Sequence, residues 1–171
     1  MRKKAVIVIA MLICSIFVGG MKVQAADGSV EVNVPNEYLK KLINVTLKKE
    51  ETAPITRQEM ESLTTLDTTN IPTVDSDTQI HTHGISDLTG LEYAVNLEEL
   101  HLKENEITDL SPIANLQKLK KLDVHRNELT DITPLKSLKN LEYLDIYNNK
   151  IRDISPLTSL KKLTFLDMHY V

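Results

Sequence analysis

The sequence predicts an α/β solenoid with parallel strands on its concave face, short 3₁₀ turns on its convex face and an α-helical N-terminal cap. The first observation is a period of 22 residues that starts near residue 75 and continues without an insertion to the last residue. The second is that a unit of this length cannot enclose its own apolar side, so stacked neighbours must supply the core. The third is a segment with helix signals ahead of the repeats. The leucines that open successive copies are Leu97, Leu119, Leu141 and Leu163.

Residues 1–25 have the pattern of a secretory signal peptide. A basic start at residues 2–4 precedes an apolar run over residues 5–18, and a small-residue site predicts cleavage after Ala25. A retained membrane anchor is the alternative interpretation. It is disfavoured because a spanning helix needs about 20 apolar residues, and this run is interrupted by two glycines and Lys22.

Charge and cysteine content narrow the class of partner. Cleavage would remove four basic residues and no acid, which moves the formal net charge from −4 to −8. Such an acidic chain is a poor match for nucleic acid or anionic lipid, because both attract basic surfaces. The only cysteine, Cys14, lies in the signal and follows Ile13 rather than the small residue of a lipoprotein signal, so we expect neither lipid attachment nor disulfides. We predict a secreted, extracellular monomer without membrane insertion.

Residues 26–66 are expected to form the helical N-terminal cap. Asn36 can cap one helix, and Thr56 with Glu59 three residues later makes a capping box for a second. Such a cap would cover the bare apolar end of the first repeat, although a separate functional domain is the rival interpretation. The segment 65–77 is expected to be a loop because it is rich in Thr and Asp. The apolar positions of the first helix are Leu39, Leu42, Ile43 and Leu47.

Residues 67–171 form the predicted repeat region. Within a unit, Leu100 and Leu102 are two residues apart and point the same way from an extended strand, while the residues between and beside them face solvent. Strands of successive units should then stack in parallel about 4.8 Å apart. The predicted units are an irregular first repeat at 75–96, full repeats at 97–118, 119–140 and 141–162, and a partial repeat at 163–171.

Two further positions recur in every full repeat. An asparagine follows each strand, and its amide can pair with backbone groups that the turn leaves free; this predicts a buried ladder whose loss costs about 1–3 kcal/mol for each stranded group. An Asp-x-(Ser or Thr)-Pro sequence follows, in which Ser or Thr can cap a short helical turn and Pro suits its first residue. The ladder residues are Asn105, Asn127 and Asn149, and the prolines are Pro112, Pro134 and Pro156.

The unit Leu-x-x-Leu-x-Leu-x-x-Asn-x-Ile-x-Asp-Ile-x-Pro-Leu, the phrase at residues 85–93 and a helical cap after a signal peptide resemble the internalin-type leucine-rich-repeat proteins of Gram-positive bacteria. The resemblance implies a leucine-rich-repeat solenoid whose concave face binds a protein, which in some members is a host receptor. Members typically continue into an immunoglobulin-like domain and often a cell-wall sorting signal. Because the sequence stops at Val171, inside a repeat, we expect a truncated product or a fragment of a longer protein.

The repeat register identifies the side chains of the concave face. An aromatic group gathers in the last two copies, at Tyr143, Tyr147 and Phe165, where it has no core to serve. Tyrosine is enriched at binding hot spots, so we predict a partner protein from a host or bacterial surface. The same register places Asp77, Gln79 and His81 on the first strand. The predicted partner-binding residues are Glu99, His101, Lys103, Lys121, Asp123, His125, Tyr143, Asp145, Tyr147, Phe165, Asp167 and His169.

The same register suggests two alternatives in which the face binds a cation or a cofactor. Stacked Asp123, Asp145 and Asp167 could attract a cation, or could be solvated carboxylates relieved by Lys121 and His125. Four face histidines could capture zinc or haem, but most lie two strands apart, so no metal or cofactor is predicted. The chain could instead be a structural spacer of a cell-surface protein. Catalysis is not expected, because nucleophile, phosphate-loop and metalloprotease motifs are missing from the sequence.

Overall fold

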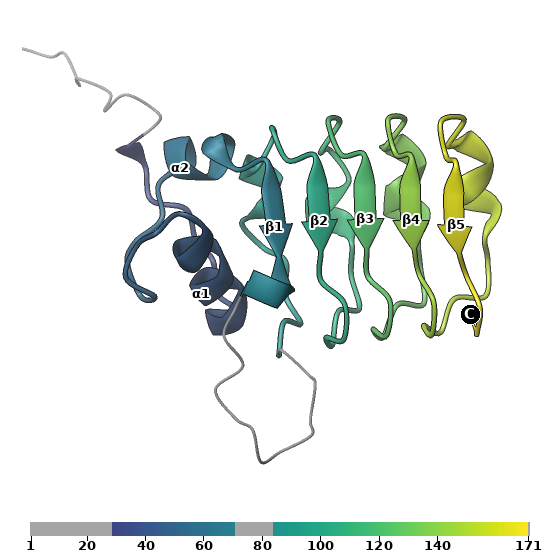
Figure 1. The fold of residues 1–171 in the computed structure, drawn as a ribbon, viewed down its shortest axis with the longest axis horizontal. Coiled ribbons are helices and arrows are strands. Elements are labelled where there is room, and N and C mark those ends of the chain that lie inside the picture. Colours follow the sequence, from purple (N-terminus) through teal and green to yellow (C-terminus); the bar gives the residue numbers. More distant parts are fainter. Residues whose placement is uncertain (1–28, 71–83, 171) are drawn as a thin grey trace, which may run out of the picture.

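The computed structural model describes residues 29–70 and 84–170, and it shows a single parallel sheet with a helical cap at one end (Figure 1). Within these residues, no helix is both long enough and apolar enough to cross a membrane. The predicted signal peptide lies outside the described residues. The helices are α1 (Glu37–Thr46) and α2 (Arg57–Ser62), and the strands are β1 (Thr65–Asp67), β2 (Glu99–His101), β3 (Lys121–Asp123), β4 (Tyr143–Asp145) and β5 (Phe165–Asp167).

The five strands pair in chain order, β1-β2-β3-β4-β5, and every pair is parallel. From β2 onward the register advances by one repeat, so Leu100 pairs with Leu122 and Leu122 pairs with Leu144. The connection between consecutive strands passes through the opposite side of the molecule, where short 3₁₀ turns lie (Figure 1). The predicted leucine-rich-repeat solenoid is therefore confirmed, together with the register of its full repeats.

The first strand is not where the sequence register placed it. Thr65, Leu66 and Asp67 pair with the three residues of β2, although segment 65–77 was expected to be a loop and Asp77 was expected to lie beside Glu99. The boundary drawn at residue 66 between cap and repeats thus falls inside β1. The first repeat is longer than the others, so extrapolating the period back from Glu99 missed its strand. Asp77, Gln79 and His81 lie outside the described residues.

The two predicted cap helices are confirmed, with their capping residues. The Asn36 side chain accepts a hydrogen bond from the backbone N–H of Leu39, which satisfies a free donor at the start of α1. Thr56 and Glu59 form the capping box of α2, because each side chain bonds the backbone N–H of the other. A short bridge between Glu31 and Thr56 ties the chain entering the cap to the start of α2.

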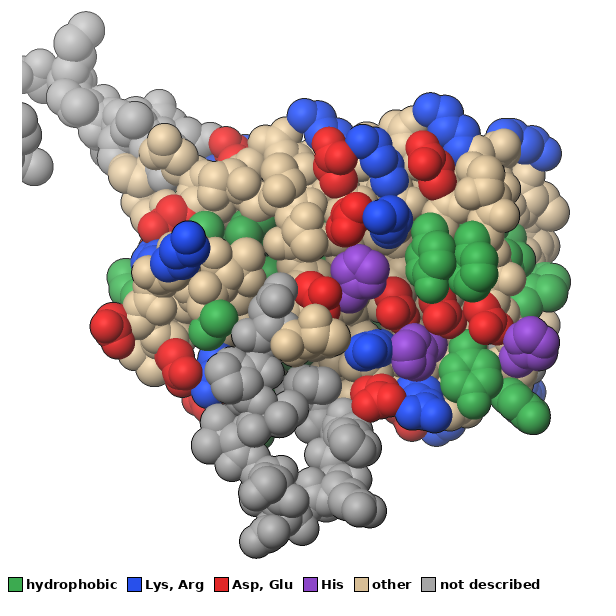
Figure 2. Space-filling model, viewed as in Figure 1, with side chains coloured by type: hydrophobic (Ala, Val, Ile, Leu, Met, Phe, Trp, Pro, Cys, Tyr) green, Lys and Arg blue, Asp and Glu red, His purple; other side chains and the backbone are tan. Residues whose placement is uncertain are grey.

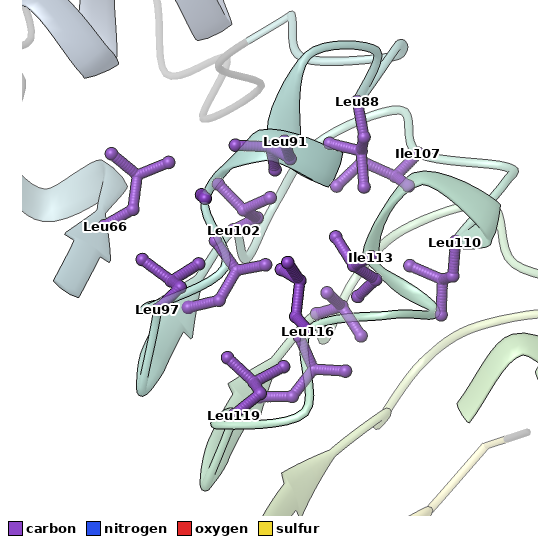
Figure 3. Packing of buried hydrophobic residues seen from close by; sticks show 14 of the residues in the cluster. Leu66, Leu88, Leu91, Leu97, Leu102, Ile107, Leu110, Ile113, Leu116 and Leu119 are labelled. Atoms are coloured by element: carbon purple, nitrogen blue, oxygen red, sulfur yellow. The ribbon is translucent and has the colours of Figure 1, made fainter. Parts of the chain in front are cut away.

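The core is one continuous stack of aliphatic side chains that runs from the cap into the repeats (Figure 3). Leu39 and Leu42 of α1 and Leu66 of β1 are fully buried, so the helix covers the end of the sheet as expected of a cap. The stack opens at the other end, where Leu166 and Met168 are each 38% exposed. The labelled leucines and isoleucines of Figure 3 point into the space between the strand side and the 3₁₀ turns.

The 3₁₀ turns begin one residue earlier than the predicted cap implies. Ser111 is the first residue of its turn, and the preceding Leu110 occupies the cap position without a side-chain hydrogen bond. Asp109 caps the turn instead, because its carboxylate accepts a hydrogen bond from the Ser111 backbone N–H at 2.7 Å. The same bond recurs one and two repeats later. The 3₁₀ turns of the repeats are Leu91–Tyr93, Ser111–Ile113, Thr133–Ser137 and Ser155–Ser159, and Thr68–Asn70 follows β1.

Candidate functional site on the strand face

The solvent-facing side of the five-stranded sheet carries all of the predicted partner-binding residues, and we call it the strand face. Alternation along each strand sends the central leucine into the core and its two neighbours outward. Figure 2 shows this face: hydrophobic side chains gather over β4 and β5, next to a row of acidic side chains. Polar side chains of both signs cover the part of the face over β2 and β3.

The asparagine ladder holds the chain as it leaves each strand. Asn127 is 5% exposed; its Oδ1 accepts the backbone N–H of Ile107 at 2.9 Å, and its Nδ2 donates to the carbonyls of Leu102 and Val124, both at 3.0 Å. Asn149 repeats this pattern one unit on. Each amide therefore bonds its own repeat and the preceding one, which fixes the spacing of the side chains on the strand face.

The residue before each ladder asparagine has a left-handed backbone, and so has Tyr170 at the equivalent position of the last copy. The φ angles are +57° at Glu104, +54° at Arg126, +52° at Asn148 and +55° at Tyr170. Such a conformation is uncommon for residues other than glycine, and it turns the chain sharply out of the strand. The turn also projects these side chains toward the rim of the strand face, so that Arg126 and Tyr170 both contact the Tyr147 ring.

Two aromatic groups stand on the face at the β4 and β5 end. Tyr143 and Phe165 are stacked with ring centroids 4.3 Å apart and planes 3° apart. Tyr147 packs edge-on against Tyr170 at 5.9 Å and against the His125 ring at 6.1 Å. Phe165 is 45% exposed and Tyr170 is 79% exposed, so this aromatic surface is open to solvent. Tyr170 was missed by sequence reasoning, because it lies one position beyond the predicted strand-face columns.

A row of carboxylates runs between the two aromatic groups. The strand register aligns Asp67, His101, Asp123, Asp145 and Asp167 across the whole sheet. Sequence reasoning predicted the last four members but placed Gln79 where Asp67 lies. The strand after the cap could have been found only from its own short Thr-Leu-Asp sequence, because the period does not reach it.

Histidines contact the carboxylates of this row. His125 Nδ1 lies 2.7 Å from Asp123 Oδ1 and 3.5 Å from Asp145 Oδ2, and the His169 ring bonds Asp167 at 2.7 Å. Burial favours a raised pKa at Asp123, but His101, the backbone N–H of His125 and the His125 ring together hold that pKa below its usual value. At Asp145 the balance is opposite: burial first, and then the charges of Asp123 and Asp167, raise its pKa.

His101 is expected to make stability depend on pH. Its interaction with Asp123, at 3.9 Å a charge contact rather than a hydrogen bond, raises the pKa of His101 most; burial lowers it, and Asp67 and Glu99 raise it further. A raised folded-state pKa means that protonated His101 stabilises the fold below the unfolded-state pKa of about 6.5. This contribution is lost as pH rises through the higher folded-state pKa.

Urea unfolding between pH 5 and pH 8 checks this expectation in the wild type and in His101→Gln. The free energy of unfolding of the wild type should fall relative to the variant as pH rises, and proton NMR should show a pKa for His101 above its usual value. Parallel pH profiles for the two proteins would contradict the assignment.

Three of these side chains have the geometry to hold a cation. Asp123, His125 and Asp145 each offer one ligand atom, and the three atoms lie within 4.8 Å of one another. The combination of imidazole and carboxylate suits several transition metals. His125 already bonds Asp123, so a metal would have to replace an existing contact. The sequence predicts no metal at these residues.

The repeat region matches a known family of repeats. Residues 95–137 and 139–170 match the model described as leucine rich repeats (2 copies). Among solved structures, an internalin (InlF) from Listeria monocytogenes is 36% identical, with a TM-score of 0.69, over 79% of this chain and 36% of that chain. The chain is an internalin-like leucine-rich-repeat protein. The resemblance stated from the sequence is thereby confirmed.

Two further Listeria monocytogenes structures are similar to the internalin-like chain. Internalin C2 is 28% identical with a TM-score of 0.55, and the match covers 84% of this chain and 70% of that one. The functional domain of InlJ, which includes a cysteine ladder, is 25% identical with a TM-score of 0.65 over 80% of this chain and 27% of that one. The internalin-like chain has a single cysteine and so carries no such ladder. Comparison with curated proteins gives no match.

Proposed function

We propose that this chain is a secreted or cell-surface module that binds a protein partner through the strand face, without catalysis. The partner is a host or bacterial surface protein, and the contact is centred on Tyr143, Tyr147 and Phe165. The internalin-like repeat fold supports a role in protein binding. The signal peptide predicted from the sequence supports secretion.

The stacked Tyr143–Phe165 pair carries this proposal. Two rings at 4.3 Å with nearly parallel planes form an apolar cluster that is open to solvent, although neither ring contributes to the buried core. Their strands are hydrogen-bonded neighbours in a sheet backed by the ladder, so the rings are held in place before a partner arrives. Rigid aromatic side chains bind with little loss of conformational entropy, which is why they are frequent among binding hot spots.

The size of the strand face is adequate for a specific complex. Five strands spaced about 4.8 Å apart span about 20 Å, and a standard interface buries about 800 Å² on each partner. The polar residues over β2 and β3 would then form one side of a rim around the aromatic centre. Area does not set affinity, so the aromatic residues are expected to decide the strength of binding.

Affinity capture followed by a binding assay on purified variants tests the proposal. The immobilised protein is exposed to surface extracts of host cells and of bacteria, and each captured protein is then purified and measured by surface plasmon resonance. Tyr143→Ala and Tyr147→Ala are each expected to cost about 2 kcal/mol of binding, or about a thirtyfold rise in Kd. The matched control is Tyr38→Ala on α1, because Tyr38 is 55% exposed but lies in the cap.

The assay also separates the alternatives. A structural spacer should tolerate both strand-face substitutions, so unchanged binding and unchanged assembly in a longer protein would contradict the proposal. A partner that responds equally to Tyr38→Ala would bind the cap instead. Metal or haem capture through face His, Tyr and Asp residues predicts uptake of zinc or haem by the purified protein in equilibrium dialysis, with no need for a protein partner.

A further inference from the structure

Opposite charges are paired across neighbouring repeats at several positions of the repeat unit. Glu98 pairs with Lys120 at 2.7 Å, Glu99 with Lys121 at 2.8 Å and Glu104 with Arg126 at 2.6 Å, and each pair joins equivalent positions of adjacent repeats. Glu128 and Lys150 repeat the arrangement. Because equivalent positions stack side by side, alternating the sign of charge is the simple way to avoid repulsion between repeats.

The aspartate row breaks this pattern. Asp123, Asp145 and Asp167 stack on three adjacent strands with like charges side by side. Among the described residues, no lysine or arginine lies within ion-pair distance of any of the three; their partners are histidines. The side chains of Asp123 and Asp145 are only 13% and 15% exposed, so water screens this repulsion less than it would on an open surface.

Asp145 is the centre of the arrangement. Asp123 and Asp167 flank it across the sheet. Tyr143 lies two residues before it on β4, and Tyr147 lies two residues after it, just beyond the end of β4. The negative charges act on Tyr143: burial raises the pKa of Tyr143 most, and the charges of Asp145, Asp123 and Asp167 raise it further. A cation above Asp145 would therefore meet carboxylates below it and aromatic rings on two sides.

We propose that a basic side chain of the protein partner, an arginine in preference to a lysine, binds above Asp145 between Tyr143 and Tyr147. This inference rests on the proposed function of the strand face. A guanidinium group is planar, can bridge carboxylates on neighbouring strands about 4.8 Å apart, and packs against aromatic rings. The protein already shows one such contact, because the Arg126 guanidinium lies 5.9 Å from the Tyr147 ring centre.

Peptide titration followed by ¹H–¹⁵N NMR tests the inference without knowledge of the partner. The probes are an acetylated triarginine amide, the trilysine peptide and the tricitrulline peptide, which has nearly the shape of triarginine but no charge. Triarginine should shift the backbone amides of residues 143–147 at lower concentration than trilysine, and tricitrulline should not shift them. Asp145→Asn should weaken triarginine binding about tenfold, the loss expected for a hydrogen bond to a charged group.

A matched variant separates this site from general attraction to an acidic protein. Glu106→Gln removes one negative charge from an exposed residue in the turn after β2, and it should change triarginine binding by less than twofold. Asp145→Asn keeps an oxygen that can accept the Tyr147 N–H, now at 3.1 Å, so the variant is expected to fold. Equal weakening by both variants, or equal shifts by triarginine and tricitrulline, would overturn the proposal.

The last probe is Zn²⁺, added without a peptide. If Zn²⁺ saturates Asp123, His125 and Asp145 while triarginine causes no shift, the row is a metal site and the proposal is wrong. The outcome is separable from that of the proposed function. If a captured partner needs Tyr143 but binds Asp145→Asn as well as the wild type, the inference about a basic side chain is wrong and the proposed protein-binding face stands. If triarginine binds at Asp145 but no partner uses the strand face, the proposed function is wrong and the cation-binding site stands.

Discussion

Replacing Leu122 with alanine is expected to lower the free energy of unfolding by about 3–5 kcal/mol. Leu122 is fully buried and lies between Leu100 and Leu144 in the central column of the sheet, so its loss leaves a cavity that two neighbouring repeats share. A stacked array of this kind depends on contacts between nearest neighbours. Urea denaturation followed by far-ultraviolet circular dichroism measures the change.

Leu166→Ala is the matched control for this experiment. Leu166 occupies the same position of its repeat on β5 but is 38% exposed, because no repeat covers its outer side in the structure. Its substitution should cost less than about 1.5 kcal/mol, in proportion to the smaller apolar area removed from water. Similar losses for the two variants would mean that the central column does not carry the stability assigned to it.

Asn127→Ala is expected to cost about 2–4 kcal/mol. The Ile107 N–H has no other partner among the described residues, so the substitution strands a buried donor. The carbonyls that Asn127 bonds each keep another donor. Asn105 also donates to the Leu102 carbonyl, and Asn149 also donates to the Val124 carbonyl. The loss therefore comes mainly from one N–H group and from the space that the amide filled.

Hydrogen exchange can locate this loss as well as measure it. The Ile107 amide should exchange much faster in Asn127→Ala than in the wild type, while amides of the cap helices keep their relative order. Asn115→Ala, an exposed asparagine in the same repeat region, should change the free energy of unfolding by less than about 0.5 kcal/mol. An unchanged Ile107 exchange rate in the ladder variant would show that water replaces the side chain at no cost.

The repeat region could be predicted closely because one physical constraint recurs in it. Each copy must bury Leu at the same strand position and return by the same route, so the register of β2 to β4 follows from Leu100, Leu122 and Leu144 alone. The cap helices could also be predicted, because Asn36 and Thr56 bond backbone groups only three residues further along the chain. Local signals and a strict period are both visible in a sequence.

The structure differs from the sequence prediction where neither a local signal nor the period applies. β1 pairs with β2 across a longer first repeat, so its place is set by tertiary stacking on the cap and not by the period. For the same reason Asp67 was not predicted in the aspartate row. The pairing of Asp109 with the Ser111 N–H was missed because Asp and Ser both suit the start of a turn, and only the backbone geometry decides between them.

The ion pairs between equivalent positions of adjacent repeats also bear on how the chain assembles. The leucines and asparagines are nearly identical from one unit to the next, so an aliphatic core alone would accept its units in any order. The ion pairs differ between boundaries: Glu98 pairs with Lys120 between the first two full repeats, and Glu128 pairs with Lys150 between the next two. Exchanging units 119–140 and 141–162 would preserve the hydrophobic lattice but place Glu98 beside Glu142 instead of Lys120. The exchanged chain would therefore bring two like charges together at the boundary of unit 97–118.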